Sequence, residues 1–167
     1  MRLETEVKLD FKDVLIRPKR STLGSRKEVE LERQFTYKNY QYRGHPKFEH
    51  DPHYVGVPIM ASNMDGVGTF EVADTLAKDK MVTCLVKTYS VNELVTFFDT
   101  VDETVRNQRC NYTAYSMGIT DADHQKFRRV YEEAEGIKYV CIDVANGYSE
   151  RFLDFVKTFR SLYPSIV

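Results

Sequence analysis

The sequence lacks the features that mark several broad classes of protein. It has only three cysteines, Cys84, Cys110 and Cys141, and no CxxC pair, so neither a disulfide framework nor a zinc site is expected. No apolar run approaches the roughly 18 residues of a membrane span, and the acidic start begins no signal peptide. Lys and Arg total 24 against 25 Asp and Glu, which excludes the cationic excess of a protein that coats nucleic acid. We therefore expect a cytoplasmic protein with reduced thiols and with neither a membrane nor a nucleic-acid polymer as partner.

The 167 residues have the length of one domain, and 42% hydrophobic with 29% charged residues is typical of a globular protein. Residues 1–56 form an extension and a surface loop. Alternation over Lys8–Ile16 predicts a short strand or an extended segment, and a second strand is predicted over Val29–Tyr37. From Asn39 to Tyr54 the chain is polar and aromatic with glycine and proline breakers, which predicts a long surface loop.

The pattern of apolar residues changes from residue 57 onward. Short, nearly continuous apolar runs suit strands that are buried on both faces, as in a parallel sheet. Four such runs occur, at Val57–Ala61, Met81–Val86, Tyr112–Met117 and Tyr139–Ala145.

Each run is followed by a pattern of helical period. One helix has Phe70, Ala73, Leu76 and Ala77 on one face, and a second has Leu94, Phe97, Phe98 and Val101 behind a Ser90–Glu93 capping box. The third has Phe127, Val130, Tyr131 and Ala134 after a Thr120 cap, and the fourth has Phe152, Phe155, Val156 and Phe159 between Ser149 and Pro164.

Strand and helix alternate four times, which predicts an α/β fold of βαβ units. A complete TIM-type (β/α)8 barrel has about 31 residues per unit, and residues 57–167 hold about four units at similar spacing. The chain is therefore predicted to supply the first four units of such a barrel, with Ser165–Val167 as the opening of a fifth strand. An apolar interface of the half-barrel is expected at Ile59, Leu85 and Ile142.

In a barrel of this kind, functional side chains lie at the carboxyl ends of the strands. Lys87 and Asp143 both occupy such ends. A cation and a carboxylate there can steer a proton or orient an amide, and they can equally form a salt bridge that closes the barrel mouth. The sequence leaves both interpretations open.

Three further features have ordinary explanations that we favour. The Gly66–Thr69 segment before a helix could hold an anion, but a turn that needs positive φ explains it as well. Cys84 and Cys141 are expected to act as small buried hydrophobes, beside no cation that would make a thiolate, and Cys110 to lie at the non-catalytic end of the barrel. The remaining feature is a set of metal-ligand residue types that we interpret as a solvated loop, namely His45, Glu49, His50, Asp51 and His53.

Three segments of this sequence resemble GMP reductases of the IMP dehydrogenase/GMP reductase family. They are Lys8–Leu23, Asn63–Glu71 and Cys141–Glu150. The last segment distinguishes GMP reductases from IMP dehydrogenases. The resemblance extends over the whole chain apart from an insertion at residues 41–54, but it covers only the first half of the family's barrel.

The resemblance implies nucleotide salvage by NADPH-dependent reductive deamination of GMP to IMP and ammonia. In the family a cysteine attacks purine C2, ammonia leaves, and hydride from NADPH reaches C2. Lys87 and Asp143 match residues of the deamination step and of cofactor binding, and Met64 matches the methionine that packs on the purine. The remaining matched positions bind cofactor: Val144 and Ala145 at the strand end, and Ser25 and Arg26 toward a neighbouring subunit of a tetramer.

Some positions depart from the family pattern. Gly66 stands where threonine is usual, and Val86 and Thr88 stand where histidines usually flank the lysine. The nucleophilic cysteine and its monovalent-cation (K⁺) site belong to later units, and no other metal is implied. Two hypotheses follow. The chain is one half of a working reductase, whose other half is a second polypeptide or a part that the given sequence does not include, or it is a non-catalytic remnant or interaction module that docks onto intact reductase subunits. Alone, it is predicted to be inactive.

Overall fold

The computed structural model describes residues 3–38, 53–134 and 136–167 of the chain. They fall into two units, Met1–Glu30 and Leu31–Val167, which are described separately. Among the helices of these described residues, none is both long and apolar enough to cross a bilayer.

The smaller unit contains two short 3₁₀ helices, Phe11–Asp13 and Arg26–Glu28. Of the two predicted forms of Lys8–Ile16, the strand is wrong, and extended residues occur only on either side of the first 3₁₀ helix. Asp10 and Asp13 explain the difference, because each side chain accepts a hydrogen bond from a backbone N–H group of the other end of the turn, as in a capping box. These local hydrogen bonds compete with an extended conformation.

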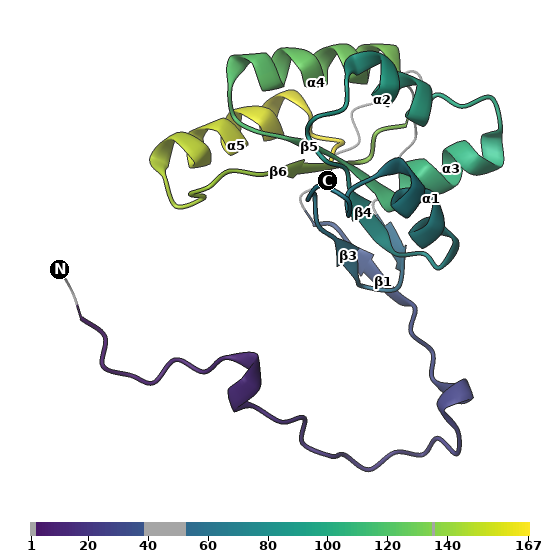
Figure 1. The fold of residues 1–167 in the computed structure, drawn as a ribbon, viewed down its shortest axis with the longest axis vertical. Coiled ribbons are helices and arrows are strands. Elements are labelled where there is room, and N and C mark those ends of the chain that lie inside the picture. Colours follow the sequence, from purple (N-terminus) through teal and green to yellow (C-terminus); the bar gives the residue numbers. More distant parts are fainter. Residues whose placement is uncertain (1–2, 39–52, 135) are drawn as a thin grey trace. The chain divides into compact units, whose positions relative to one another are not determined.

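The larger unit contains a four-stranded parallel sheet in the order β3-β4-β5-β6 (Figure 1). Its strands are β3 (Met60–Ala61), β4 (Val82–Cys84), β5 (Thr113–Met117) and β6 (Tyr139–Ile142). The four predicted parallel strands are confirmed, although each is shorter than its apolar run. At the end of the chain, Val140 donates its N–H to the Val167 carbonyl, and Val167 donates to Lys138. These are the bonds of a parallel pairing beside β6, as expected of a fifth strand.

A second sheet pairs β1 (Arg33–Thr36) with β2 (His53–Gly56) in antiparallel register. Strand β1 falls within the predicted strand, but His53 and Tyr54 were assigned to the surface loop, and that assignment is wrong. Tyr54 is buried, and its hydroxyl donates to the carbonyls of Val57 and Lys80 at 2.7 and 2.8 Å. Burial of this ring holds β2 in place. The rest of the predicted loop, residues 39–52, lies outside the described residues, as does nearly all of the insertion at 41–54.

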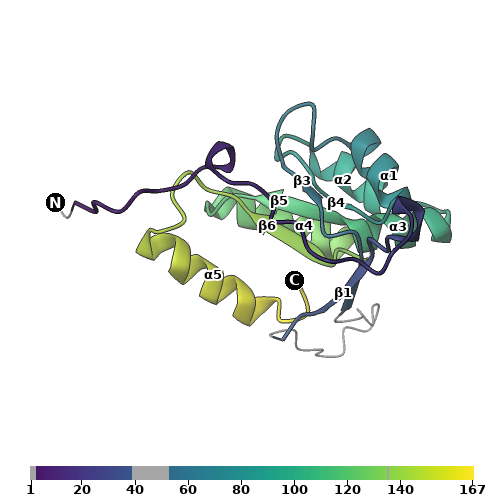
Figure 2. The same ribbon diagram turned by 90° about the horizontal axis from the view of Figure 1, so that it is seen from below.

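Five helices follow the strands: α1 (Phe70–Lys78), α2 (Val91–Phe98), α3 (Glu103–Tyr112), α4 (Asp121–Glu133) and α5 (Glu150–Leu162). The four predicted helices are confirmed, with their caps at Thr69, Ser90, Thr120 and Ser149. Figure 2 shows α1 and α5 at opposite ends of the parallel sheet. Val101 was expected on the buried face of α2, but this helix ends at Phe98 and Val101 is fully exposed.

The sheet has two different faces because successive side chains alternate across a strand. Toward the helices, Leu85, Tyr115 and Met117 are buried in one core, with Ile142 packed against it. Toward the other side, Val82, Cys84, Ala114 and Tyr139 form a second cluster with Tyr54. The predicted interface is therefore wrong for Leu85 and Ile142, which face the helices, whereas Ile59 is 58% exposed. Four βα units in parallel order agree with the expected α/β class, and the closed barrel remains an expectation.

Candidate functional site

Lys87 and Asp143 meet at the carboxyl edge of the parallel sheet. Lys87 follows β4 and Asp143 follows β6, and the Lys87 Nζ lies 2.9 Å from Asp143 Oδ2. Asn63, which follows β3, donates from its Nδ2 to the same oxygen at 3.0 Å. Three segments that are far apart in sequence thus converge on one carboxylate. The predicted neighbourhood of the charged pair is confirmed, and Asn63 is an additional member of this group, which we call the strand-end triad.

The electrostatics of the triad favour an ionised carboxylate. The hydrogen bond from Lys87, then that from Asn63, holds the pKa of Asp143 below its usual range, against the opposing effect of burial. The Lys87 and Asp143 side chains are 42% and 43% exposed, so a ligand can reach both charged groups. Lys87 and Asp143 form a salt bridge, as one interpretation predicted. Because both groups are accessible, they can also transfer a proton or orient an amide, as the other interpretation requires.

The backbone around the triad is held by the sheet and by α4. Asp143 donates its N–H to the Met117 carbonyl at 2.8 Å, which continues the β5–β6 ladder to the carboxylate. Lys126, on α4, donates to the Lys87 carbonyl at 2.9 Å. Lys126 was not predicted as part of the site, because a lysine in an amphipathic helix is usually solvated. Val144 and Ala145 directly follow Asp143, before a turn in which Asn146 Oδ1 accepts from the Tyr148 N–H.

The glycines of the first loop have backbone explanations. Gly66 has φ of +75°, which favours glycine. Gly68 lies so close to the backbone of Cys84 and Val86 that a Cβ atom would overlap them. The N–H groups of Val67 and Gly68 both donate to the Met64 carbonyl, so they are not available to an anion. The turn interpretation is therefore supported, and the exposed Met64 side chain projects from this turn.

The remaining predicted positions belong to the smaller unit, to β2 or to the residues that are not described. Ser25 caps the second 3₁₀ helix, where its hydroxyl accepts from the Lys27 N–H, and Arg26 is that helix's first residue. His53 contacts Thr36 through its Nδ1 at 2.8 Å, and the other residues of the histidine-rich segment lie outside the described part. Within residues 3–38, 53–134 and 136–167, no three His, Cys, Asp or Glu side chains could hold a metal ion.

The cysteines differ from one another more than the sequence indicated. Cys84 is buried and Cys141 is partly buried, and both side chains lie on the side of the sheet that is turned away from the helices. The interaction with Cys84 lowers the pKa of Cys141, and burial acts against it. Cys84 is a small buried side chain, as expected. Burial raises the pKa of Cys110 to about 11.

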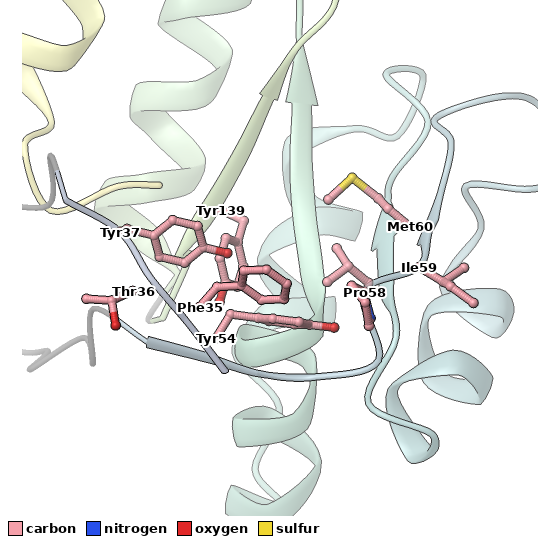
Figure 3. A pocket seen from close by; sticks show the side chains of 9 residues that line it. Phe35, Thr36, Tyr37, Tyr54, Pro58, Ile59, Met60 and Tyr139 are labelled. Atoms are coloured by element: carbon pink, nitrogen blue, oxygen red, sulfur yellow. The ribbon is translucent and has the colours of Figure 1, made fainter. Parts of the chain in front are cut away.

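A cavity of about 390 Å³ lies at the opposite end of the strands (Figure 3). Aromatic rings of Phe35, Tyr54 and Tyr139 line it together with Ile59 and Met60, and it contains no acid–base pair. Because the ionisable side chains gather at the carboxyl edge, we place the candidate site at the triad rather than in this cavity.

Comparison with known proteins identifies the family of this chain. Residues 8–167 match the family model of the IMP dehydrogenase / GMP reductase domain. The chain is 46% identical over 164 residues to a GMP reductase of Ascaris suum, which covers 98% of this chain and 43% of that protein. It is also 46% identical over 165 residues to a GMP reductase of Citrobacter koseri, covering 99% of this chain and 44% of the relative. The chain thus spans less than half the length of these relatives, and it belongs to the IMP dehydrogenase/GMP reductase family.

Proposed function

We propose that this chain is the N-terminal half of a cytoplasmic, GMP reductase-like oxidoreductase. The reaction is the NADPH-dependent reductive deamination of GMP to IMP and ammonia. The observation that carries the proposal is the strand-end triad, which lies at the sheet edge where such a barrel does its chemistry, in a chain 46% identical to GMP reductases.

The triad provides a proton donor of fixed position. Asp143 is ionised at neutral pH, because its neighbours lower its pKa, and it holds the Lys87 Nζ in an ion pair at 2.9 Å. The Lys87 Nζ–H can donate to an amino group that departs from the purine, which makes it a general acid for deamination. The carboxylate of Asp143 can in turn accept a hydrogen bond from an amide, while Asn63 keeps it in position.

The residues beside the triad fit a nicotinamide cofactor. When bound, NADPH supplies the hydride that replaces the lost amino group. We assign its binding to Lys87, Asp143, Val144 and Ala145, because a half-exposed carboxylate and cation are followed directly by two small apolar residues. Two residues of the smaller unit, Ser25 and Arg26, are assigned to the cofactor of a neighbouring subunit, and the exposed Met64 is assigned to purine packing.

None of the three cysteines of this chain is assigned as the nucleophile. Cys84 and Cys141 lie in strands and Cys110 lies in α3, and none matches the family's catalytic position. We propose that a C-terminal half carries the catalytic cysteine with its K⁺ site, and that the joined barrels form tetramers. The alternative is a non-catalytic module that docks onto intact reductase subunits.

Substitution in the joined enzyme tests the roles of the triad. The chain is mixed with the C-terminal part of the Citrobacter koseri GMP reductase, and GMP-dependent NADPH oxidation is measured. Lys87→Met is expected to lower turnover by about 100-fold or more, the range of a lost general acid. Lys78→Met, at an exposed site of α1, is the matched control and should leave turnover unchanged. Equal turnover of the two variants would contradict the role of Lys87.

A further inference from the structure

A second lysine holds the backbone of Lys87. Lys126 lies on α4 and donates from its Nζ to the Lys87 carbonyl at 2.9 Å. The two lysines come from neighbouring βα units, because Lys87 follows β4 whereas α4 follows β5. The segment that carries Lys87 is therefore held from outside its own unit, by a residue to which the proposed reaction gives no role.

The segment after β4 is short, and its other end is held separately. Lys87 and Thr88 form a turn. The Tyr89 ring then stacks on Phe70 with 3.8 Å between the ring centroids, and its hydroxyl accepts from the Phe70 N–H at 3.3 Å. In the part of the chain that the structure describes, no backbone N–H group donates to the Lys87 carbonyl, so this oxygen depends on Lys126 for its hydrogen bond.

The surroundings of Lys126 differ from those of a freely solvated lysine. The side chain is partly buried, and the next residue, Phe127, is completely buried in the core below α4. Burial lowers the pKa of Lys126, and the carboxylates of Asp123 and Glu93 act in the opposite direction. Two acidic residues, from α4 and α2, thus favour the charged form of this donor.

We propose that Lys126 is a positioning residue of the strand-end triad, a role that rests on the proposed function. By holding the Lys87 carbonyl, Lys126 keeps the turn in the conformation that places the Lys87 Nζ 2.9 Å from Asp143 Oδ2 and 3.3 Å from the Asp143 carbonyl. Without this bond the turn can move, and Lys87 is then misplaced relative to the amino group that it protonates. Lys126 acts only through Lys87.

The pKa of Asp143 reports the position of Lys87, because the hydrogen bond from Lys87 is the largest effect that lowers it. It is measured on the folded chain by carbon-13 NMR of the side-chain carboxyl groups during a pH titration. Lys126→Met should raise this pKa by about 0.3 pH units or more. Lys126→Arg keeps a charged donor and should restore most of the difference. An unchanged pKa in Lys126→Met would overturn the proposal.

A double-variant cycle separates positioning from the direct effect of a lost charge. If Lys126 acts through Lys87, Lys126→Met should leave the pKa of Asp143 unchanged in a chain that already carries Lys87→Met. A rise of the same size in that background would overturn the proposal. Arg129→Met is the matched control, because it removes a cation from an exposed site of the same helix, and it should leave the pKa in place. Lys126→Ala replaces Lys126→Met if that variant does not fold.

Kinetics of the joined enzyme extend the test to the reaction. Lys126→Met is expected to lower kcat by about 10- to 100-fold with an unchanged KM for GMP, because a misplaced proton donor slows the chemical step without weakening substrate binding. Lys126→Arg should restore most of the turnover, and Arg129→Met should have the wild-type value. Lys126→Met that changes KM alone, or that turns over at the wild-type rate, would contradict the proposal.

The two kinds of measurement distinguish failure of this proposal from failure of the proposed function. A joined enzyme without activity would contradict the proposed function, and the NMR titration would still decide whether Lys126 positions Lys87. An active enzyme in which Lys126→Met lowers turnover as much in the Lys87→Met background as in the wild type would overturn the action of Lys126 through Lys87.

Discussion

At the scale of single residues, we expect the Lys87–Asp143 pair to contribute to catalysis more than to the stability of the fold. Both side chains are more than two-fifths exposed, and exposed ion pairs contribute at most about 1 kcal/mol to the free energy of unfolding. We therefore expect Lys87→Met to change the urea unfolding free energy by less than about 1 kcal/mol. A loss of several kcal/mol would show that the pair is a structural link and would weaken its assignment to catalysis.

The pH dependence of Asp143 has a definite sign. Because its pKa is lower in the folded than in the unfolded chain, its contribution to stability is complete above the unfolded value of about 4. That contribution is lost as the pH falls through the folded pKa. The difference in unfolding free energy between wild type and Asp143→Asn should thus shrink on acidification. Asp65→Asn, at an exposed site in the first loop, is the control, and a difference that grows toward low pH would contradict the expected direction.

At the scale of the elements, two side chains cap the N-terminus of α4. The Thr120 hydroxyl accepts from the Asp123 N–H at 3.1 Å, and the Asp123 carboxylate accepts from the Thr120 N–H at 3.1 Å. Thr120→Ala should cost about 1 kcal/mol of unfolding free energy, measured by urea titration. Thr158→Ala, at an exposed site of α5, should change it by less than about 0.5 kcal/mol. Equal effects would show that the cap does not stabilise α4.

Helix α3 is polar, and Arg109 attaches it to its neighbours. The guanidinium contacts both carboxylate oxygens of Asp74 on α1 at 2.7 Å and donates to the Phe97 carbonyl on α2 at 2.8 Å. Its planar donors match this arrangement, and a lysine keeps only the charge.

Arg109→Lys is consequently expected to lower the unfolding free energy by about 1–3 kcal/mol and to increase amide exchange in α3. Arg128→Lys on α4 is the control, because Arg128 is exposed and pairs only with Glu132 one turn away in the described part of the chain. Unchanged exchange in α3 would show that other contacts hold this helix.

These elements also show how far the sequence predicts the fold. The Ser90–Glu93 capping box, the Thr120 cap and the apolar faces behind them located α2 and α4, because those signals are local. Helix α3 was missed, since its sequence has almost no apolar face and its attachment through Arg109 is a tertiary contact. Strand β2 was missed for a similar reason, because the hydrogen bonds of Tyr54 are made to residues outside the strand.

The candidate site was predictable only in part. Lys87 stands directly after one apolar run and Asp143 near the end of another, so their meeting at one sheet edge followed from parallel topology. The face of the sheet on which each side chain lies did not follow from the topology. For this reason Leu85 was assigned to the wrong face, and the placing of Cys84 and Cys141 on one face was not predicted.

At the scale of the whole molecule, the parallel sheet has edges that invite pairing. Strand β3 is paired with β4 alone in the described residues, and it is followed closely by the exposed Met64. Unpaired strand edges and exposed apolar side chains favour association. We expect native mass spectrometry to show a one-to-one complex with a C-terminal half. A chain that stays monomeric in the presence of that half would favour the non-catalytic alternative.

Complementation of the two halves decides between the proposed reductase function and the non-catalytic alternative. The purified 167-residue chain, the C-terminal part of the Citrobacter koseri GMP reductase and their mixture are each supplied with GMP and NADPH, and IMP is measured with the NADPH consumed. We predict no reaction with either half alone and equal formation of IMP and loss of NADPH in the mixture. A mixture that co-elutes yet forms no IMP, or IMP formation by this chain alone, would contradict the proposed function.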